Sequence, residues 1–145
     1  MDRLSKLYRL SGDERWLLLK ATALLAFIRA SLAVLPYPSV RPLLDRASRT
    51  SHRLARRPQP PDQLAWATRV AGRIVPHGGH CFSQALTLRI FLARRNYPST
   101  ICFGVQQGDN SPLMAHAWVE HDGEVLIGGD NLHRFRRLAA PESLP

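Results

Sequence analysis

The sequence contains few of the residues that crosslink small proteins or bind metals in them. Of its 145 residues only Cys81 and Cys102 are cysteines, which is too few for a disulfide framework. Neither Cys-x-x-Cys nor His-Glu-x-x-His occurs, so we expect neither a metal nor another cofactor in this chain. The N-terminus shows no secretory signal peptide, which predicts a cytoplasmic protein whose two thiols are free.

Lysine is also scarce, because eighteen of the twenty basic residues are arginines. The formal net charge is +9, and the whole excess lies in residues 1–80, where 14 basic residues face 5 acidic ones. Residues 81–145 hold 6 of each sign. This asymmetry indicates either an anionic partner or a solvated basic face. The arginine-rich stretch 40–57 has no aromatic residue to stack on bases, so membrane-surface contact or an acidic protein fits better than nucleic acid.

Length and composition fit one globular domain. A hydrophobic content of 45% allows a chain of this length to build a core without disulfides. We expect a single domain over residues 1–145. Residues 1–60 would form a helical, basic N-terminal region, and residues 61–145 would form the helix and sheet that carry the chemistry.

A long first helix is predicted to begin after Ser11 and to end before Pro36. Ser11 and Glu14 have the spacing of a capping box, in which each side chain accepts a hydrogen bond from the other residue's backbone N–H. The run is apolar enough to suggest a membrane span, but Lys20 and Arg29 lie within it, and central charges are costly in lipid. We therefore expect a core helix, while a basic amphipathic helix could also lie on a membrane surface.

Two shorter helices are expected next. Residues 36–38, Pro-Tyr-Pro, predict a rigid connector, and residues 40–54 predict a helix with arginines on its polar face. After a proline-rich loop, Asp62 is a suitable N-cap for a helix that runs to about Val75. The residues expected to face the core recur every four positions: Trp66, Val70 and Ile74.

The stretch 78–86 is the most distinctive part of the sequence. There a glycine pair precedes Cys81, which we expect in the first turn of a helix. One face of this helix would carry Cys81, Ala85, Leu88 and Leu92. The positive end of the helix dipole favours the thiolate, which is the form that attacks carbonyl carbon. Cys81 is therefore the candidate nucleophile.

Three strands are expected after this helix, because the hydrophobic period changes to two. Residues 101–106 alternate in this way, and so does the segment from Met114 to His121. Asp122-Gly123 is a strong hairpin signal, and the third strand would cover Glu124 to Ile127. Helices followed by a small antiparallel sheet place the chain in the α+β class.

His116 is the candidate general base, because the second strand would present it on a rigid sheet. Imidazole exchanges protons near neutral pH, so it can take the proton of a thiol and return it to a leaving amine. Two further residues could shape the pocket. His80 adjoins Cys81, and Trp118 shares a strand face with His116 and is expected to be buried. A metal site made of Cys81, His116 and Asp130 is chemically conceivable but lacks a recognised motif.

A third group should orient the imidazole, and the strand register selects among the acids nearby. With a tight turn at residues 122–123, His116 pairs with Gly129, which is next to Asp130. Asp130 would then point to the opposite face unless a bulge at the glycine pair turns it back. Asp130 is the favoured orienting group, and Glu120 or a backbone carbonyl is the substitute.

Four segments together resemble a known family: residues 81–86, 103–105, 115–120 and 126–130. They are similar to the transglutaminase-like cysteine proteases of lasso peptide biosynthesis, which remove the leader from a precursor peptide. The resemblance covers roughly residues 10–138. The sequence His-Ala-Trp-Val-Glu, at residues 116–120, is shared with the wider transglutaminase-like superfamily, whereas the whole combination is more specific.

The resemblance implies a transglutaminase-like or papain-like cysteine protease fold, with N-terminal helices and a nucleophile-bearing helix packed on a small antiparallel sheet. It implies the order nucleophile, base and orienting acid along the chain, which gives these roles to Cys81, His116 and Asp130. Members often carry the acid about twelve residues after the histidine. This chain has Gly128 there, and its nearest acid is two residues later.

The implied activity is removal of a leader peptide by thiolate attack and hydrolysis of the acyl-enzyme. The chain would be the catalytic half of a split protein. Its implied partners are the precursor peptide, a separate leader-binding domain protein and an ATP-dependent macrolactam cyclase, with any ATP used by the cyclase. Two alternatives remain open: an acyl or amine transferase of the same superfamily, and a non-catalytic membrane- or protein-binding adaptor with an inert thiol.

Overall fold

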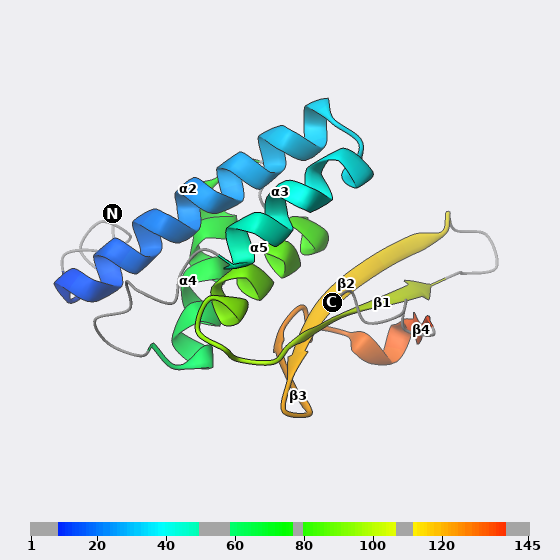
Figure 1. Cartoon of the computed structure of the whole chain (residues 1–145). Helices are drawn as coiled ribbons and strands as arrows, with labels where there is room; N and C mark the ends of the chain where they lie inside the picture. The colour runs from blue at the N-terminus through cyan, green and yellow to red at the C-terminus, as the bar shows by residue number, and fades with distance from the viewer. Residues whose placement is uncertain (1–8, 50–58, 77–79, 107–111, 139–145) are drawn as a thin grey trace.

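A computed structural model describes residues 9–49, 59–76, 80–106 and 112–138. These residues form four α-helices followed by a four-stranded antiparallel sheet and a short 3-10 helix. The helices form a layer on one face of the sheet (Figure 1). The predicted α+β class is therefore confirmed.

The first described helix, α2 (Gly12–Val34), begins as its sequence predicted. The Glu14 N–H donates to Ser11 Oγ at 3.2 Å, and the Ser11 N–H donates to Glu14 Oε2 at 2.8 Å, which is the expected capping box. By length and composition alone α2 could cross a membrane. One of its faces is instead packed against α4 and α5. The buried residues of that face are Leu17, Leu18, Ala21, Leu25 and Ile28.

Helix α3 (Tyr37–Arg49) starts earlier than predicted. The expectation of a rigid connector at residues 36–38 was wrong, because Tyr37 and Pro38 lie in the first turn of α3. Proline is tolerated there, since its missing N–H would have no partner within the helix. Val40 and Leu44 are buried and pack against α5. Residues 50–54 of the predicted helix lie outside the described residues.

Helix α4 (Pro61–Ile74) corrects two predictions. Its N-cap is Pro60, and Asp62 lies within the first turn rather than capping it. The predicted core stripe was wrong in part: Trp66 is partly buried and packs against the core, but Ile74 is half exposed. The buried residues are Leu64, Ala65, Ala67, Thr68 and Ala71. Alanine carries little hydrophobic weight in a sequence pattern, but its small side chain lets α4 pack closely against α2.

Helix α5 (Cys81–Ala93) is enclosed by its neighbours. It contacts α2, α3, α4, β1 and β2. The predicted buried face is confirmed, because Ala85, Leu88 and Leu92 are inaccessible to solvent. Ser83, Thr87 and Phe91 are buried as well, so the helix is covered on most sides. The first residue of α5 is therefore held in place by the surrounding core.

The sheet has the strand order β3-β2-β1-β4. The bounds are β1 (Thr100–Gln106), β2 (Met114–His121), β3 (Glu124–Ile127) and β4 (Arg136–Arg137). The predicted hairpin between β2 and β3 is confirmed: His121 pairs with Glu124, and Asp122 and Gly123 both have the positive φ of a tight turn. The 3-10 helix η1 (Leu132–Arg134) and β4 had not been predicted.

The β2–β3 ladder contains a bulge, although not where the sequence suggested. Glu120 pairs with Val125, but Val119 pairs with Ile127, which leaves Leu126 as the extra residue. The Leu126 carbonyl accepts a hydrogen bond of 2.9 Å from Arg69 Nη1 of α4, which satisfies a backbone group that the bulge takes out of the ladder. The ladder ends before Gly128 and Gly129, the predicted site of the bulge.

Candidate active site

Cys81 is the first residue of α5, as predicted, and its thiol is partly exposed. His80 is the N-cap, but its exposed side chain makes no capping hydrogen bond. The next residue, Phe82, fixes this end of the helix, because its ring contacts those of Tyr37 at 5.3 Å and Phe103 at 5.7 Å. The thiol therefore lies at a helix N-terminus on the side of the sheet that the helices cover.

The His116 ring is held by one hydrogen bond and by contacts with two aromatic rings, that of Phe135 and, at 6.2 Å, that of Trp118. Its Nε2 lies 2.7 Å from the Gly128 carbonyl oxygen. A carbonyl only accepts, so Nε2 carries the proton and Nδ1 is left as the acceptor. The Phe135 ring stacks on the imidazole with its centroid 4.8 Å away. The neutral tautomer with a basic Nδ1 is the one that a general base requires.

A backbone group occupies the orienting position that Asp130 was predicted to fill. Gly128 follows His116 by twelve residues, and its carbonyl bonds the ring. The Asp130 side chain is exposed, and among the described residues no hydrogen bond joins it to His116. Glu120, the first substitute, is bonded to Trp118 and Arg137 instead. The backbone carbonyl, the other substitute, is the group that contacts the ring.

The thiol and the imidazole lie on opposite faces of the sheet. Ala117 and Val119 belong to the core cluster that includes α4 and α5, and Cys81 packs against the same cluster. Side chains alternate along a strand, so His116 points to the other face. The two groups lie at a similar position along β2. Phe103 contacts Phe82, the residue after Cys81, and pairs with Ala117, the residue after His116. Contact between nucleophile and base stays a prediction.

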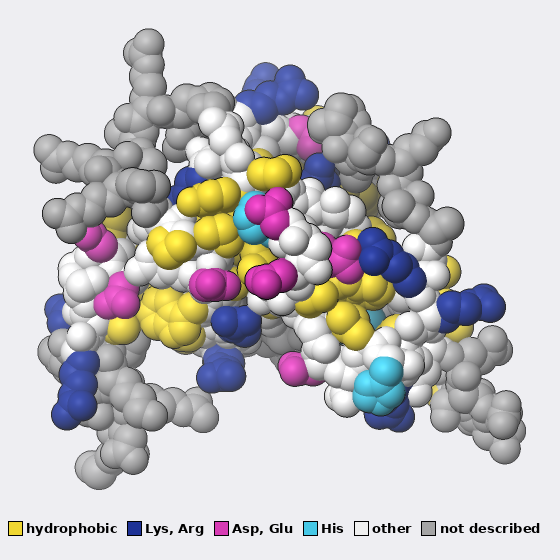
Figure 2. Space-filling model, turned by 90° about the horizontal axis from the view of Figure 1, so that it is seen from below, with side chains coloured by type: hydrophobic (Ala, Val, Ile, Leu, Met, Phe, Trp, Pro, Cys, Tyr) yellow, Lys and Arg dark blue, Asp and Glu magenta, His cyan; other side chains and the backbone are white. Residues whose placement is uncertain are grey.

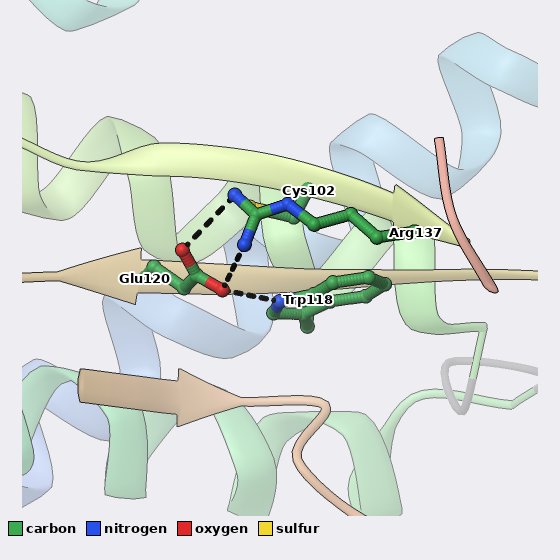
Figure 3. A network of polar contacts seen from close by, with 4 residues as sticks. All are labelled: Cys102, Trp118, Glu120 and Arg137. Atoms are coloured by element: carbon green, nitrogen blue, oxygen red, sulfur yellow. Dashed lines mark hydrogen bonds and ion pairs between the residues drawn. The ribbon is translucent and has the colours of Figure 1, made fainter. Parts of the chain in front are cut away.

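A network of polar contacts joins four residues on the outer face of the sheet: Cys102, Trp118, Glu120 and Arg137 (Figure 3). Arg137 donates to both carboxylate oxygens of Glu120, at 3.0 and 3.2 Å, and also to Cys102 Sγ at 3.0 Å. Trp118 Nε1 donates to Glu120 at 2.8 Å. The hydrogen bond from Trp118, supported by Arg137, holds the pKa of Glu120 below its ordinary value. Burial, and then the charge of Glu120, raise the pKa of the Cys102 thiol.

Trp118 is buried, as expected, but on the outer face, where the Arg137 guanidinium lies over its ring. Sequence analysis missed Phe135 and Arg137. Both lie in or beside a strand of two residues, which is too short to show a period. Gly104, opposite His116, leaves room for Phe135 and Trp118, because a Cβ at this position would meet each of them at 3.0 Å. The sequence signal that could have indicated this close packing is the glycine itself, because a glycine within a strand often marks the close approach of other groups.

A cavity of about 310 Å³ lies between α3 and α5. Its polar lining includes Arg41, Arg49 and Arg89 but only one carboxylate, Asp45. Its lining on α5 runs from Leu86 to Ala93 and does not include Cys81, while Tyr37, another lining residue, contacts the Phe82 ring beside the nucleophile. The lining suits an anionic or extended polar ligand.

The remaining histidines have no place beside Cys81 in the part of the chain that the structure describes. His121 Nδ1 donates to the Pro98 carbonyl at 2.6 Å, and its ring packs against Tyr97. His133 is exposed on η1. His77 lies outside the described residues. No group of three His, Cys, Asp or Glu side chains that could bind a metal is present among the described residues.

The chain was compared with protein families, curated proteins and solved structures. The family model of the transglutaminase-like superfamily matches residues 22–140, which is most of the sequence. The searches of curated proteins and of solved structures gave no match. The matched region contains both Cys81 and His116. Members of this superfamily are typically cysteine proteases or transferases. The match over residues 22–140 shows that the chain belongs to the transglutaminase-like superfamily.

Proposed function

We propose that this protein is a cysteine peptidase that removes the leader peptide from a lasso peptide precursor. The observation that carries the proposal is the position of Cys81 at the start of a buried helix in a transglutaminase-like chain. The His116 ring supports it, since its hydrogen bond to Gly128 leaves Nδ1 as a proton acceptor. The resemblance of residues 81–130 to the leader peptidases gives the substrate class.

In the proposed reaction His116 Nδ1 takes the thiol proton and Cys81 Sγ attacks the carbonyl carbon of the scissile peptide bond. The Cys81 backbone N–H, at the helix start, stabilises the oxyanion. The C–N bond then breaks, and the new amine of the core peptide receives the proton from the imidazolium. Water hydrolyses the thioester, which releases the leader as a carboxylate and restores the thiol.

This reaction requires Nδ1 to come within hydrogen-bond distance of Sγ, roughly 3 Å. In the structure the two groups face opposite sides of the sheet, so the start of β2 must turn relative to α5 when the peptide binds. The Gly128 carbonyl fixes the required tautomer before this movement, and the ring has to leave that hydrogen bond to reach the thiol. The role that Asp130 would have as an orienting carboxylate is thereby assigned to a neutral backbone group.

The cavity between α3 and α5 supports a peptide substrate. It lies along the helix that carries the nucleophile, and its arginines could bind acidic side chains or a carboxylate of an extended peptide. The partners proposed with this activity are a leader-binding protein and an ATP-dependent macrolactam cyclase. The basic surface of α3, with Arg46 and Arg49 in its last turn, is suited to docking one of them.

The test incubates the full chain with a precursor peptide encoded beside it and with the leader-binding protein, followed by mass spectrometry. Hydrolysis yields a leader with a plain carboxylate, whereas a transferase would leave an adduct of higher mass. Cys81→Ala should abolish either product. Cleavage that survives in Cys81→Ala, or an adduct in place of the free acid, would overturn the peptidase proposal.

A non-catalytic adaptor would be recognised by its thiol. An adaptor's Cys81 would react with iodoacetamide no faster than free cysteine between about pH 6 and 7, while a catalytic thiolate reacts faster. The comparison with His116→Ala then shows whether the imidazole contributes. A rate that is unchanged in His116→Ala would remove His116 from the proposed mechanism.

A further inference from the structure

Helix α2 has a second apolar face, opposite the one that packs in the core. With about 3.6 residues per turn, this face is a single stripe along the whole helix. Its large side chains are Trp16, Leu19, Phe27 and Val34, which are 58%, 57%, 51% and 81% exposed. The smaller exposed residues between them are alanines. Such a continuous exposed stripe marks an interaction surface.

The stripe extends beyond the helix. Leu35, the C-cap of α2, and Leu43 of α3 are also about half exposed. Eleven large apolar side chains are exposed among the described residues, and six of them lie on α2, its cap or α3. Just over half of the exposed large apolar side chains therefore belong to α2, its cap and α3, and α2 forms the outer edge of the helical layer (Figure 1).

Basic side chains border the stripe on both sides. The helical repeat puts Lys20 at one border, together with Asp13 of the first turn, and Arg15 and Arg29 at the other. Lys20 Nζ lies 5.1 Å from the centre of the Trp16 ring, so its stem follows the apolar surface. The face that is turned away from α2, by contrast, shows acidic side chains near its middle (Figure 2). An apolar band between two cationic borders matches the interface of an anionic bilayer, where long basic side chains reach the headgroups.

We propose that α2 docks this protein on an anionic membrane surface, with α2 lying in the plane of the interface. A transmembrane orientation does not fit, because the opposite face of α2 buries Leu17, Leu25 and Ile28 in the core. A second copy of the chain is a poor occupant, because both copies would carry a net charge of +9. Anionic lipid is complementary to that charge and to the stripe.

Docking in this way is independent of the thiol chemistry. Cys81 belongs to α5, which packs against the buried face of α2, opposite the exposed stripe. The membrane would therefore concentrate the protein without covering the nucleophile. A membrane-held peptidase would meet substrates and partners that are themselves at the membrane.

The experiment is sedimentation of the full chain with phosphatidylcholine vesicles, with and without phosphatidylglycerol. We expect binding to the anionic vesicles, weaker binding to the neutral ones, and loss of binding at high salt. Trp16 is the one exposed tryptophan among the described residues, so its emission should shift to shorter wavelength on binding. No sedimentation with anionic vesicles would overturn the proposal.

Variants locate the binding surface. Leu19→Ser with Phe27→Ser should lower vesicle binding at least about ten-fold. Lys20→Glu with Arg29→Glu should lower it at least about twenty-five-fold at low salt, because loss of each cation costs roughly five-fold and each new carboxylate adds repulsion. The matched control is Leu113→Ser, which changes a side chain of similar exposure just before β2 and should bind like the wild type.

Other outcomes would contradict the proposal. If Leu19→Ser with Phe27→Ser binds as well as the wild type, α2 is not the membrane surface. If the wild type forms dimers that these substitutions dissociate, the stripe is an interface between copies. Cys81→Ala should bind vesicles normally, so loss of peptidase activity and loss of docking are separable results.

Discussion

The two cysteines of this chain occupy different environments. Cys81 is partly exposed at the first residue of α5, where the backbone N–H groups of a helix start are without helical partners. Cys102 is buried in the middle of β1, where burial and the charge of Glu120 raise the pKa of its thiol. Arg137 contacts its sulfur but is itself paired with the Glu120 carboxylate. The same side chain is therefore set up for reaction at one position and for packing at the other.

The difference shows what a nucleophilic site requires beyond a thiol. Cys102 has a cation within 3.0 Å, yet burial and a nearby carboxylate outweigh it. Cys81 has access to solvent and the backbone N–H groups of a helix start. Access and unpaired backbone donors thus distinguish the reactive position more clearly than the nearest charge does.

Replacement of the two cysteines should have opposite consequences for activity. Cys81→Ala should lower the rate of precursor cleavage by at least about a thousand-fold, because no other group can form the thioester. Cys102→Ala should retain most of the activity, since this thiol is outside the site. The measurement is the rate of leader release followed by mass spectrometry. Equal losses in the two variants would show that the activity depends on something other than the Cys81 thiol.

Alkylation should separate the same two residues without a substrate. In the folded protein at neutral pH, iodoacetamide should modify Cys81 on the order of a hundred-fold faster than Cys102, because the buried thiol is both shielded and protonated. Arg137→Ala should speed labelling of Cys102 by loosening β4, and should leave Cys81 unchanged. Peptide mapping gives both rates, and protein in urea is the control in which the rates should converge.

Gly128 follows the last residue of β3, and its carbonyl bonds the His116 ring. We expect its replacement to lower the stability of the protein. It has φ 79°, and a Cβ there would meet the Ala117 carbonyl oxygen at 2.7 Å. We expect Gly128→Ala to lower the free energy of unfolding by about 2–3 kcal/mol.

The matched control for this change is Gly123→Ala. Gly123 has a similar φ of 82°, but a Cβ added there would have no other atom within 4 Å, so the loss should be nearer ~1 kcal/mol. Urea denaturation measures both losses. If the two variants lose equal stability, the cost comes from the positive φ alone, and the close contact of Gly128 with β2 makes no contribution.

The smallest effect should come from the Glu120 carboxylate. Its pKa is lowered in the folded state, so its contribution to stability is complete above the ordinary value of 4.5 and is lost as the pH falls through the lowered pKa. Glu120→Gln should therefore cost about 0.5–1 kcal/mol near pH 7 and nothing at strongly acidic pH, where the wild type is also neutral. Urea unfolding of the wild type and of Glu120→Gln across this pH range measures the difference in stability. A difference that does not change with pH would contradict the prediction.

Local signals predicted the fold well. The capping box of α2 and the hairpin at Asp122 and Gly123 were correct, because each depends on residues that are neighbours in sequence. The core face of α4 was missed, since it is formed by alanines that matter only when α2 packs on them. The strand β4 was missed because two residues show no periodicity.

The candidate site was predictable only in part. The position of Cys81 followed from the glycines and the apolar helix after it, and the strand of His116 followed from its alternation. The group that bonds the imidazole is a backbone carbonyl, which no residue type reveals. The shifted register at Leu126 also has no separate sequence signal, and the residue that bonds its carbonyl, Arg69, lies on a distant helix.

The enclosure of α5 has a consequence for the order in which the protein forms. Three of the elements that cover it precede it in the chain, while β1 and β2 follow it. During synthesis α5 therefore emerges as an apolar segment whose remaining cover has not yet been translated. Its first residue gains a fixed position only when the strands are added. Nascent chains that are released early should consequently lack a working thiol and depend on chaperones for solubility.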